Sequence, residues 1–119
     1  MPKTPDHAAQ SLQLFKATFF KALAHPVRIR ILELLVRRDY TVQQLQEVLQ
    51  LAQSVTSQQL AILRVHQIVV GTKRGTSVSY RVRDPLIRDL LAVARRIFDN
   101  QLVGTRDLLR RLRQTAPGG

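Results

Sequence analysis

The side chains that could support catalysis or metal binding are few and scattered along the chain. The 119 residues include three histidines, eight acidic residues and no cysteine. Without cysteine, the chain has no disulfides, thiolate metal sites or cysteine nucleophiles. His7, His25 and His66 lie far apart in the sequence, and no serine sits in a nucleophile elbow. This pattern argues against an enzyme and predicts no cofactor.

Cations, in contrast, are abundant and unevenly distributed. Nineteen lysines and arginines against eight acids give a formal net charge of +11. No acidic residue occurs between Glu47 and Asp84. The cations within this acid-free window are Arg64, Lys73, Arg74, Arg81 and Arg83. Because each neutralised phosphate releases condensed counterions, such an excess favours a polyanionic partner. A solvated basic surface is the plainer interpretation of the charge alone.

The same window contains the pattern of a short helix, from about Gln53 to His66. Its apolar side consists of Thr56, Leu60 and Leu63 at helical spacing. A helix that reads DNA needs small or polar groups on its other side, so that its backbone can approach the major groove. The residues on that side are Ser54, Ser57, Gln58 and Ala61. Glutamine can also pair bidentately with adenine.

The elements that would position this helix follow from periodicity and end signals. Helical spacing predicts an N-terminal dimerisation helix over 8–24 and a second helix over about 26–37. Thr41 and Gln44 match a capping box that starts a brief third helix, and a tight turn at residues 50–52 leads into the fourth. Residues 41–66 therefore predict a helix-turn-helix.

After Gln67 the spacing changes to the two-residue period of β-strands. Residues 68–83 predict two strands that flank a turn at Gly75, with Lys73 and Arg74 at its tip. A basic hairpin that follows a helix-turn-helix is typical of a wing, which contacts phosphates or the minor groove.

Residues 86–113 predict a C-terminal helix along which apolar side chains recur from Ile87 to Leu112, with Gly104 as a possible point of bending or interruption. So small a chain cannot cover this stripe and the one on the first helix. Burial against a second copy is the economical solution, and it predicts a two-fold homodimer. The expected fold class is mainly α with a small β-hairpin: one winged helix-turn-helix domain over 1–119, dimerised through its N- and C-terminal helices.

These features predict a regulator of transcription that binds double-stranded DNA at a two-fold operator. The expected DNA-binding residues are Gln53, Ser54, Ser57, Gln58, Ala61, Arg64, Lys73 and Arg74. No apolar run is long enough to span a membrane, and the N-terminal residues lack a signal-peptide pattern. A cytoplasmic location is therefore expected.

Several stretches resemble a known family. Residues 21–32, KALAHPVRIRIL, resemble the opening of the ArsR/SmtB regulators, and residues 51–64, LAQSVTSQQLAILR, resemble their recognition helix. Lys73-Arg74-Gly75 and the strand after it resemble their wing. The resemblance spans about residues 12–98. It implies a homodimeric repressor whose end helices form the dimer interface.

The resemblance also indicates where metal would bind, and this chain lacks most of the ligands there. Residues 40–44, YTVQQ, replace the cysteine pair of the members that sense soft metals. At the site on the last helix Asp84 is present, but Leu86, Ile97 and Asn100 occupy the other three positions. Leucine and isoleucine cannot coordinate a metal ion. No metal site of the family type is therefore expected.

Several alternatives remain open. A metal ion could bind at an atypical site made by His7 with Asp6, or by His66. The effector could instead be a small molecule held between the end helices or a partner protein, or there could be no effector. A basic winged helix that contacts protein or RNA is another class, and preference for duplex DNA over single strands of equal length would separate it.

Overall fold

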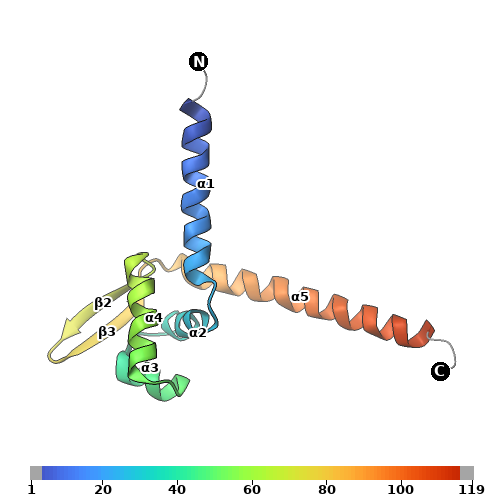
Figure 1. The fold of residues 1–119 in the computed structure, drawn as a ribbon. Helices are drawn as coiled ribbons and strands as arrows, with labels where there is room; N and C mark the ends of the chain where they lie inside the picture. Colours follow the sequence, from blue (N-terminus) through green and yellow to red (C-terminus); the bar gives the residue numbers. More distant parts are fainter. Residues whose placement is uncertain (1–3, 116–119) are drawn as a thin grey trace. The chain divides into compact units, whose positions relative to one another are not determined.

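The computed structural model describes residues 4–115, and the side chains of residues 8–114. The chain divides into two compact units, one ending at Pro85 and the other beginning at Leu86 (Figure 1). The second unit is the single helix α5 (Leu86–Thr115). The elements of the first unit, in chain order, are α1 (Thr4–Leu23), α2 (Pro26–Leu35), β1 (Tyr40–Thr41), α3 (Val42–Leu49), α4 (Gln53–Val65), β2 (Val69–Arg74) and β3 (Ser77–Val82).

The predicted helix starts are confirmed at α2 and α3. Helix α2 begins at Pro26, where the missing N–H costs nothing, and the backbone N–H of Val27 donates to His25 Nδ1 at 3.1 Å. Helix α3 begins with the full capping box. Gln44 N donates to Thr41 Oγ1 at 3.2 Å, and Thr41 N donates to Gln44 Oε1 at 2.9 Å. His25 therefore has a structural role as a helix cap.

The turn between α3 and α4 depends on a residue in the left-handed backbone region. Gln50 has φ 55°, and its N–H and that of Leu51 both donate to Gln46 O. Glycine is the usual residue in this conformation, and any other L-residue there costs about 1–2 kcal/mol. The Gln50 side chain offsets part of this cost, since its Nε2 donates to Glu47 O at 2.7 Å.

The wing belongs to a three-stranded antiparallel sheet in the order β1-β3-β2. The sequence predicted only the β2–β3 hairpin of this sheet. In the structure, Tyr40 and Thr41 of β1 pair with Tyr80 and Ser79 of β3. Opposite Tyr80 on the other side is Gly71 of β2, where a Cβ atom would lie 3.1 Å from the Tyr80 ring. Glycine at 71 therefore lets β2 lie close against this tyrosine.

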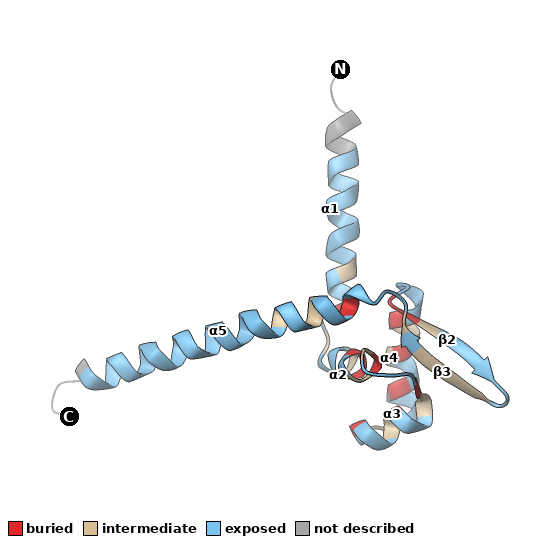
Figure 2. Cartoon of the chain, turned by 180° about the vertical axis from the view of Figure 1, so that it is seen from behind, coloured by how far each residue is buried: buried red, intermediate tan, exposed pale blue. Residues whose placement is uncertain are grey.

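The core of the first unit lies where α2, α3, α4 and the start of β2 meet, as the buried residues in Figure 2 show. The large side chains that are fully buried there are Ile31, Leu32, Leu45, Leu60, Leu63, Val69 and Thr56. Burying one aliphatic side chain stabilises the fold by about 1.5–3 kcal/mol. Most of α1 is exposed, including Phe15 at 74%.

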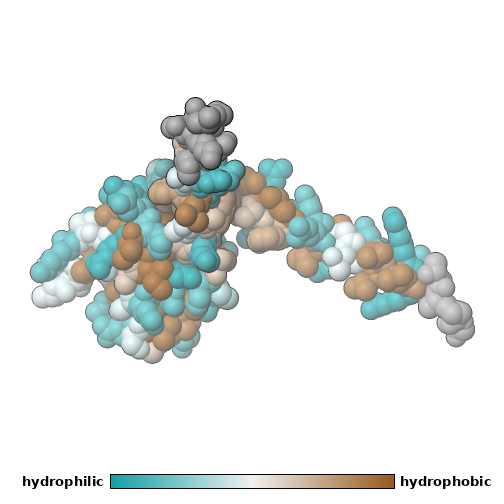
Figure 3. All heavy atoms as spheres, turned by 45° about the horizontal axis from the view of Figure 1, so that its top comes forward, coloured by the Kyte–Doolittle hydropathy of each residue, from teal (hydrophilic) through white to brown (hydrophobic). Residues whose placement is uncertain are grey.

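Helix α5 runs without a break through Gly104. Its 30 residues extend for about 45 Å at 1.5 Å per residue. Large apolar side chains remain half exposed along it, for example Phe98 at 60% and Leu112 at 56%, and Figure 3 shows them alternating with hydrophilic groups. Within residues 4–115, no helix combines the length and apolar character needed to cross a membrane.

Candidate nucleic-acid interface

Helix α4 is anchored by a buried stripe. The exposed fractions of Thr56, Leu60 and Leu63 are 0%, 1% and 0%, and the helix packs against α2, α3 and β2. Ala52 precedes the helix and provides no side-chain cap. Thr56 instead ties the start of the helix together from one turn later, because its backbone N–H and its Oγ1 hydroxyl both donate to Ala52 O, at 3.1 and 3.0 Å. The first turn of α4 is therefore fixed by a buried residue.

The opposite face of α4 is open to solvent. Ser54, Ser57 and Gln58 are exposed, and Ala61 is half-buried. Separations of three and four residues place these side chains on one face of the helix. The two ends of the helix carry the other predicted residues of this element, which are also exposed: Gln53 in the first turn and Arg64 in the last. All the residues predicted to read DNA on this element thus lie on α4 as expected.

Lys73 and Arg74 form the end of β2 at the tip of the wing. They lie opposite Val78 and Ser77 of β3, and both cations are exposed. Gly75 follows with φ 62°, a left-handed conformation that glycine adopts without strain. In Figure 1 the β2–β3 hairpin projects beyond the helices of its unit. The cations are therefore presented at the end of an extended arm.

The base of the wing is joined to the end of α4. Ile68 N donates to Leu63 O at 2.9 Å, and Arg83 N donates to Ile68 O at 2.9 Å. Gln67, just before Ile68, has φ 59°, a second left-handed residue other than glycine. Since no acidic residue occurs between Glu47 and Asp84, both α4 and the wing are built from a stretch without negative side chains. This arrangement suits contact with a polyanion.

The histidines do not assemble a site in the part of the chain with described side chains. His25 caps α2, and His66 is exposed at the end of α4. No group of three or more histidine, cysteine or acidic side chains lies together among residues 8–114. The side chains of Asp6 and His7, which one alternative invoked, lie outside the described residues.

The structure adds one cation that the sequence reasoning missed. The guanidinium of Arg38 lies 3.9 Å from the centroid of the Tyr40 ring, and its Nη1 donates to Asp39 O at 3.0 Å. Tyr40 is only 7% exposed and pairs with the wing through Tyr80, so Arg38 is fixed beside the sheet. The sequence signal for this contact was the Arg-x-Tyr spacing. It could not be interpreted from the sequence alone, because a strand of two residues such as β1 has no detectable period.

Known proteins are similar to this chain over the part of the sequence that contains the helix-turn-helix. The family model described as bacterial regulatory protein, arsR family, matches residues 25–69. The chain is 47% identical over 90 residues to the HTH-type transcriptional regulator Rv0081 of Mycobacterium tuberculosis, covering 75% of this chain and 79% of that protein. It is 31% identical over 85 residues to the biofilm growth-associated repressor of Xylella fastidiosa, covering 71% of this chain and 75% of that protein.

The solved structures agree with this assignment. The crystal structure of M. tuberculosis Rv0081 superposes with a TM-score of 0.74 at 45% identity, covering 79% of this chain and 95% of that chain. The homodimeric winged helix-turn-helix DNA-binding domain of Mb0332 from Mycobacterium bovis gives a TM-score of 0.75 at 26% identity, covering 86% of this chain and 94% of that one. This chain therefore belongs to the arsR family of bacterial regulatory proteins and is a winged helix-turn-helix transcriptional regulator, not an enzyme.

Proposed function

We propose that this regulator binds a specific sequence of double-stranded DNA as a homodimer and represses transcription there. The observation that carries the proposal is the exposed polar face of α4, fixed by buried Thr56, Leu60 and Leu63. A rigid helix with small polar side chains outward fits the major groove, whereas bulky ones would hold its backbone away.

In this proposal, α4 reads the bases. The Gln58 amide accepts a hydrogen bond from adenine N6 and donates one to adenine N7, a bidentate pair that distinguishes adenine from other bases. Ser54, Ser57 and Ala61 line the approach and add shorter contacts. Gln53 lies in the first turn, where free backbone N–H groups favour a phosphate, and Arg64 contacts the backbone from the last turn.

The wing supplies affinity without sequence preference. Lys73 and Arg74 are exposed at its tip and place positive charge where the hairpin meets phosphates or the minor groove. Each phosphate contact releases counterions, so this part of the binding free energy falls as salt concentration rises. Positioning by the wing and reading by α4 are therefore separable in experiment.

The homodimer is supported by the exposed apolar residues of the end helices. On α1, Leu12 and Phe15 are 54% and 74% exposed, and on α5 Phe98 and Leu112 are 60% and 56% exposed. A second copy would cover such stripes. The similar Mb0332 domain is described as homodimeric. A two-fold dimer places two recognition helices about 34 Å apart, one helical turn of DNA.

Repression without the family's metal sites is the remaining part of the proposal. The related Xylella protein is named a repressor, as is the SmtB homolog of Synechocystis. Leu86, Ile97 and Asn100 stand where the last-helix metal site would need ligands. Occupancy of the operator would then be controlled by a small molecule, a partner protein or the protein's own concentration, in the cytoplasm.

Selection from a pool of random duplexes tests the proposal directly. Purified full-length protein should enrich a two-fold symmetric sequence whose half-sites are centred about 10 base pairs apart. The selected duplex should bind better than either of its single strands. If no sequence is enriched, or if single-stranded RNA of equal length competes as well as the duplex, sequence-specific DNA binding is ruled out.

A further inference from the structure

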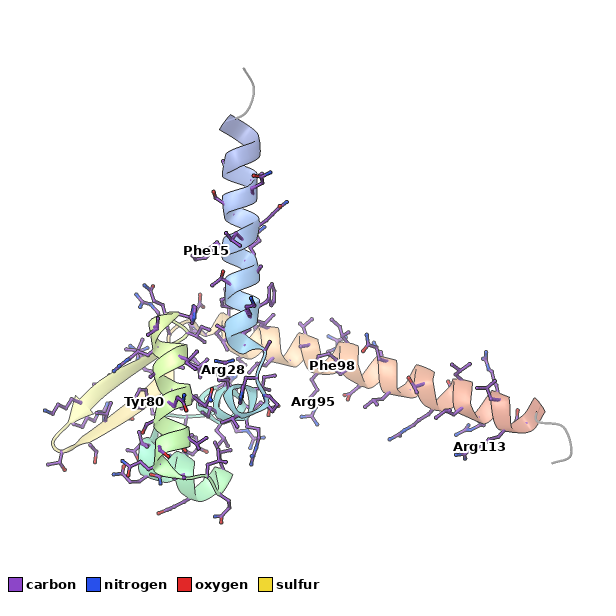
Figure 4. All side chains as sticks on the ribbon, viewed as in Figure 1. Phe15, Arg28, Tyr80, Arg95, Phe98 and Arg113 are labelled. Atoms are coloured by element: carbon purple, nitrogen blue, oxygen red, sulfur yellow. The ribbon has the colours of Figure 1, made fainter. Side chains whose placement is uncertain are left out.

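The sheet that carries the wing has two faces of opposite character. Successive residues of a strand point to opposite faces, and residues paired across strands point to the same face. On the inner face, Val69 and Tyr40 are only 1% and 7% exposed, because this face packs on the core. Gly71 belongs to the same face, since a Cβ atom there would lie 3.1 Å from both the Tyr80 ring and the Val78 side chain. Figure 4 shows Tyr80 on the side of the hairpin toward the helices.

The outer face of the sheet is polar and open to solvent. The residues on it are Thr41, Val70, Thr72, Arg74, Ser77, Ser79 and Arg81. None of them is buried, and Thr72, Arg74 and Arg81 are exposed. No acidic residue occurs on β1, β2 or β3. The outer face therefore combines guanidinium groups and hydroxyls with no carboxylate on the same three strands.

The two cations at the tip of the wing belong to different faces. Lys73 is paired with Val78 and lies on the inner face, whereas Arg74 is paired with Ser77 and lies on the outer face. A hairpin inserted into a groove turns its two faces toward the two opposite walls. Each of these two cations would then meet a different strand of the duplex.

The dimensions of the outer face fit a minor groove. Thr72 and Ser79 form a pair two residues from the last pair of the hairpin, and Arg81 lies two residues further along β3. At about 3.4 Å per residue, these positions are about 7 and 14 Å from the last pair. The minor groove of B-DNA is about 7.5 Å deep. With the last pair near the floor of the groove, the two hydroxyls would be level with its rim, and the long side chain of Arg81 would extend to the rim from just outside.

Other partners fit the outer face less well. Surfaces that bind single-stranded nucleic acid stack bases on aromatic side chains, and this face has none. Protein interfaces have an apolar core rich in aromatic side chains, whereas Val70 is the only apolar residue here. The backbone of a duplex, in contrast, is contacted by arginine and by the hydroxyls of serine and threonine.

We propose that the outer face of the wing binds the sugar–phosphate backbone along one side of the minor groove, through Arg81 and the hydroxyls of Thr72 and Ser79. Lys73 on the inner face then meets the backbone on the other side, so that the wing bridges the two strands. This contact rests on the proposed function, because it needs a duplex held by α4. It needs nothing from α5, since α4 and the wing lie in one compact unit. Arg81 adds affinity and salt dependence but no base preference.

The test compares three single variants of the full chain with the parent. Arg81→Gln removes one charge from the outer face, and Arg81→Lys keeps that charge. Arg96→Gln is the matched control, because it removes another exposed arginine, from α5, outside the unit that carries the wing. Urea unfolding and sedimentation check that each variant folds and assembles like the parent. Binding to the selected operator and to a scrambled duplex is measured by fluorescence anisotropy across a salt series.

Arg81→Gln should lower the log–log salt slope by about 0.9 per subunit on both duplexes, as one lost phosphate contact requires. Between about 50 and 200 mM salt, the loss of affinity then becomes about 3.5-fold smaller per subunit. Arg81→Lys and Arg96→Gln should keep the parental slope. If Arg81→Gln keeps it too, or if Arg96→Gln flattens it equally, the outer face does not bind phosphate and the inference is overturned.

The hydroxyls and the two faces have separate readouts. Thr72→Val removes a hydrogen-bond donor but no charge, so it should weaken binding to both duplexes by about fivefold per subunit at every salt concentration. In operator duplexes with a single neutral methylphosphonate in one half-site, the position that no longer matters to Arg81→Gln should lie on one strand. The position that no longer matters to Lys73→Ala should lie on the other strand. If both positions lie on the same strand, the wing does not bridge the groove and the proposal is wrong.

Three outcomes separate this contact from the function on which it rests. If the parent chain binds no duplex, the proposed function fails together with the contact. If the parent selects an operator but Arg81→Gln binds duplexes like the parent, the function stands and the outer face does not contact DNA. If Arg81→Gln weakens binding of single-stranded RNA and leaves the duplex slope unchanged, the outer face binds RNA and the inference is overturned.

Discussion

Replacing Gln58 by alanine separates the reading of bases from general affinity for DNA. Gln58 is exposed in the middle of α4 and lies outside the buried stripe, so the change should alter the free energy of unfolding by less than about 0.5 kcal/mol. A bidentate glutamine–adenine pair contributes about 1–3 kcal/mol of discrimination. A dimer with two such pairs should lose about 2–6 kcal/mol on the selected operator, or about 30-fold to 20,000-fold in affinity.

The assay measures the dissociation constants of the parent and Gln58→Ala proteins on two duplexes of equal length, the selected operator and a scrambled sequence. The variant should bind the scrambled duplex like the parent, because phosphate contacts are unchanged. Gln114→Ala is the matched control, since it removes another exposed helical glutamine far along α5. It should bind both duplexes like the parent.

Two results would refute this reasoning. If Gln58→Ala weakens both duplexes equally, Gln58 contacts the backbone and the reading face of α4 is assigned wrongly. If it weakens neither, α4 presents a different face to the groove. In both cases the unfolding curve of the variant must match that of the parent, so that a loss of folded protein does not imitate a loss of contact.

Four further results are expected. Lys73→Ala with Arg74→Ala should weaken binding to operator and scrambled duplex alike and lower the salt slope by about 0.9 per lost phosphate contact, which anisotropy at several salt concentrations checks. Thr56→Val should cost about 1 kcal/mol in urea unfolding, because it removes only the hydroxyl bond to the carbonyl before α4. Ile97→Glu should shift the dimer toward monomer in sedimentation and weaken operator binding together, since it puts a charge on the apolar stripe. Calorimetric titration with zinc should show no stoichiometric binding at the site of Asp84, because the other ligands of that site are absent. The Asp84→Ala variant should therefore give the same titration as the parent.

Much of the fold could be predicted because its local signals agree with its tertiary contacts. The capping box at Thr41 and Gln44 needs only residues three apart, and the structure contains both of its hydrogen bonds. The alternation after Gln67 likewise predicts the two long strands of the wing. The spacing of Thr56 to Leu60 and Leu63 predicted that it lies on the buried side of α4, and it is fully buried.

The features that escaped prediction are held by longer-range contacts. Strand β1 has two residues, too few for a period, and it exists because Tyr40 pairs with Tyr80 forty residues later. Gly104 was a candidate break, but α5 continues through it, because its cost of about 1 kcal/mol is small against the helix formers Gln101, Leu102, Arg106 and Leu108 that lie within about one turn. The left-handed turn at Gln50 lacks the glycine that would have marked it.

For the candidate interface, the residue types predicted where the polar face of α4 and the cations of the wing lie. They did not give the support of Arg38 by the Tyr40 ring, because a stacking contact depends on where β1 places the tyrosine. Which bases α4 reads depends on atoms of the DNA that no property of this sequence specifies.

The pairing of β1 also sets the mechanics of the wing. Support from β1 reaches only Tyr80 and Ser79 of β3, so the pairs from Lys73 with Val78 to Arg74 with Ser77 are held by the hairpin alone. The hairpin is thus an arm that β1 supports at its base and that has no support from β1 at its tip, where the cations lie. A small rotation about the base of the hairpin, where β1 pairs with β3, moves the tip cations much further than it moves the base. In the proposed complex, such an arm could follow the varying width of a minor groove while the packing of α4 stays unchanged, and the stiffness of the paired base would then determine how many groove shapes the wing tolerates.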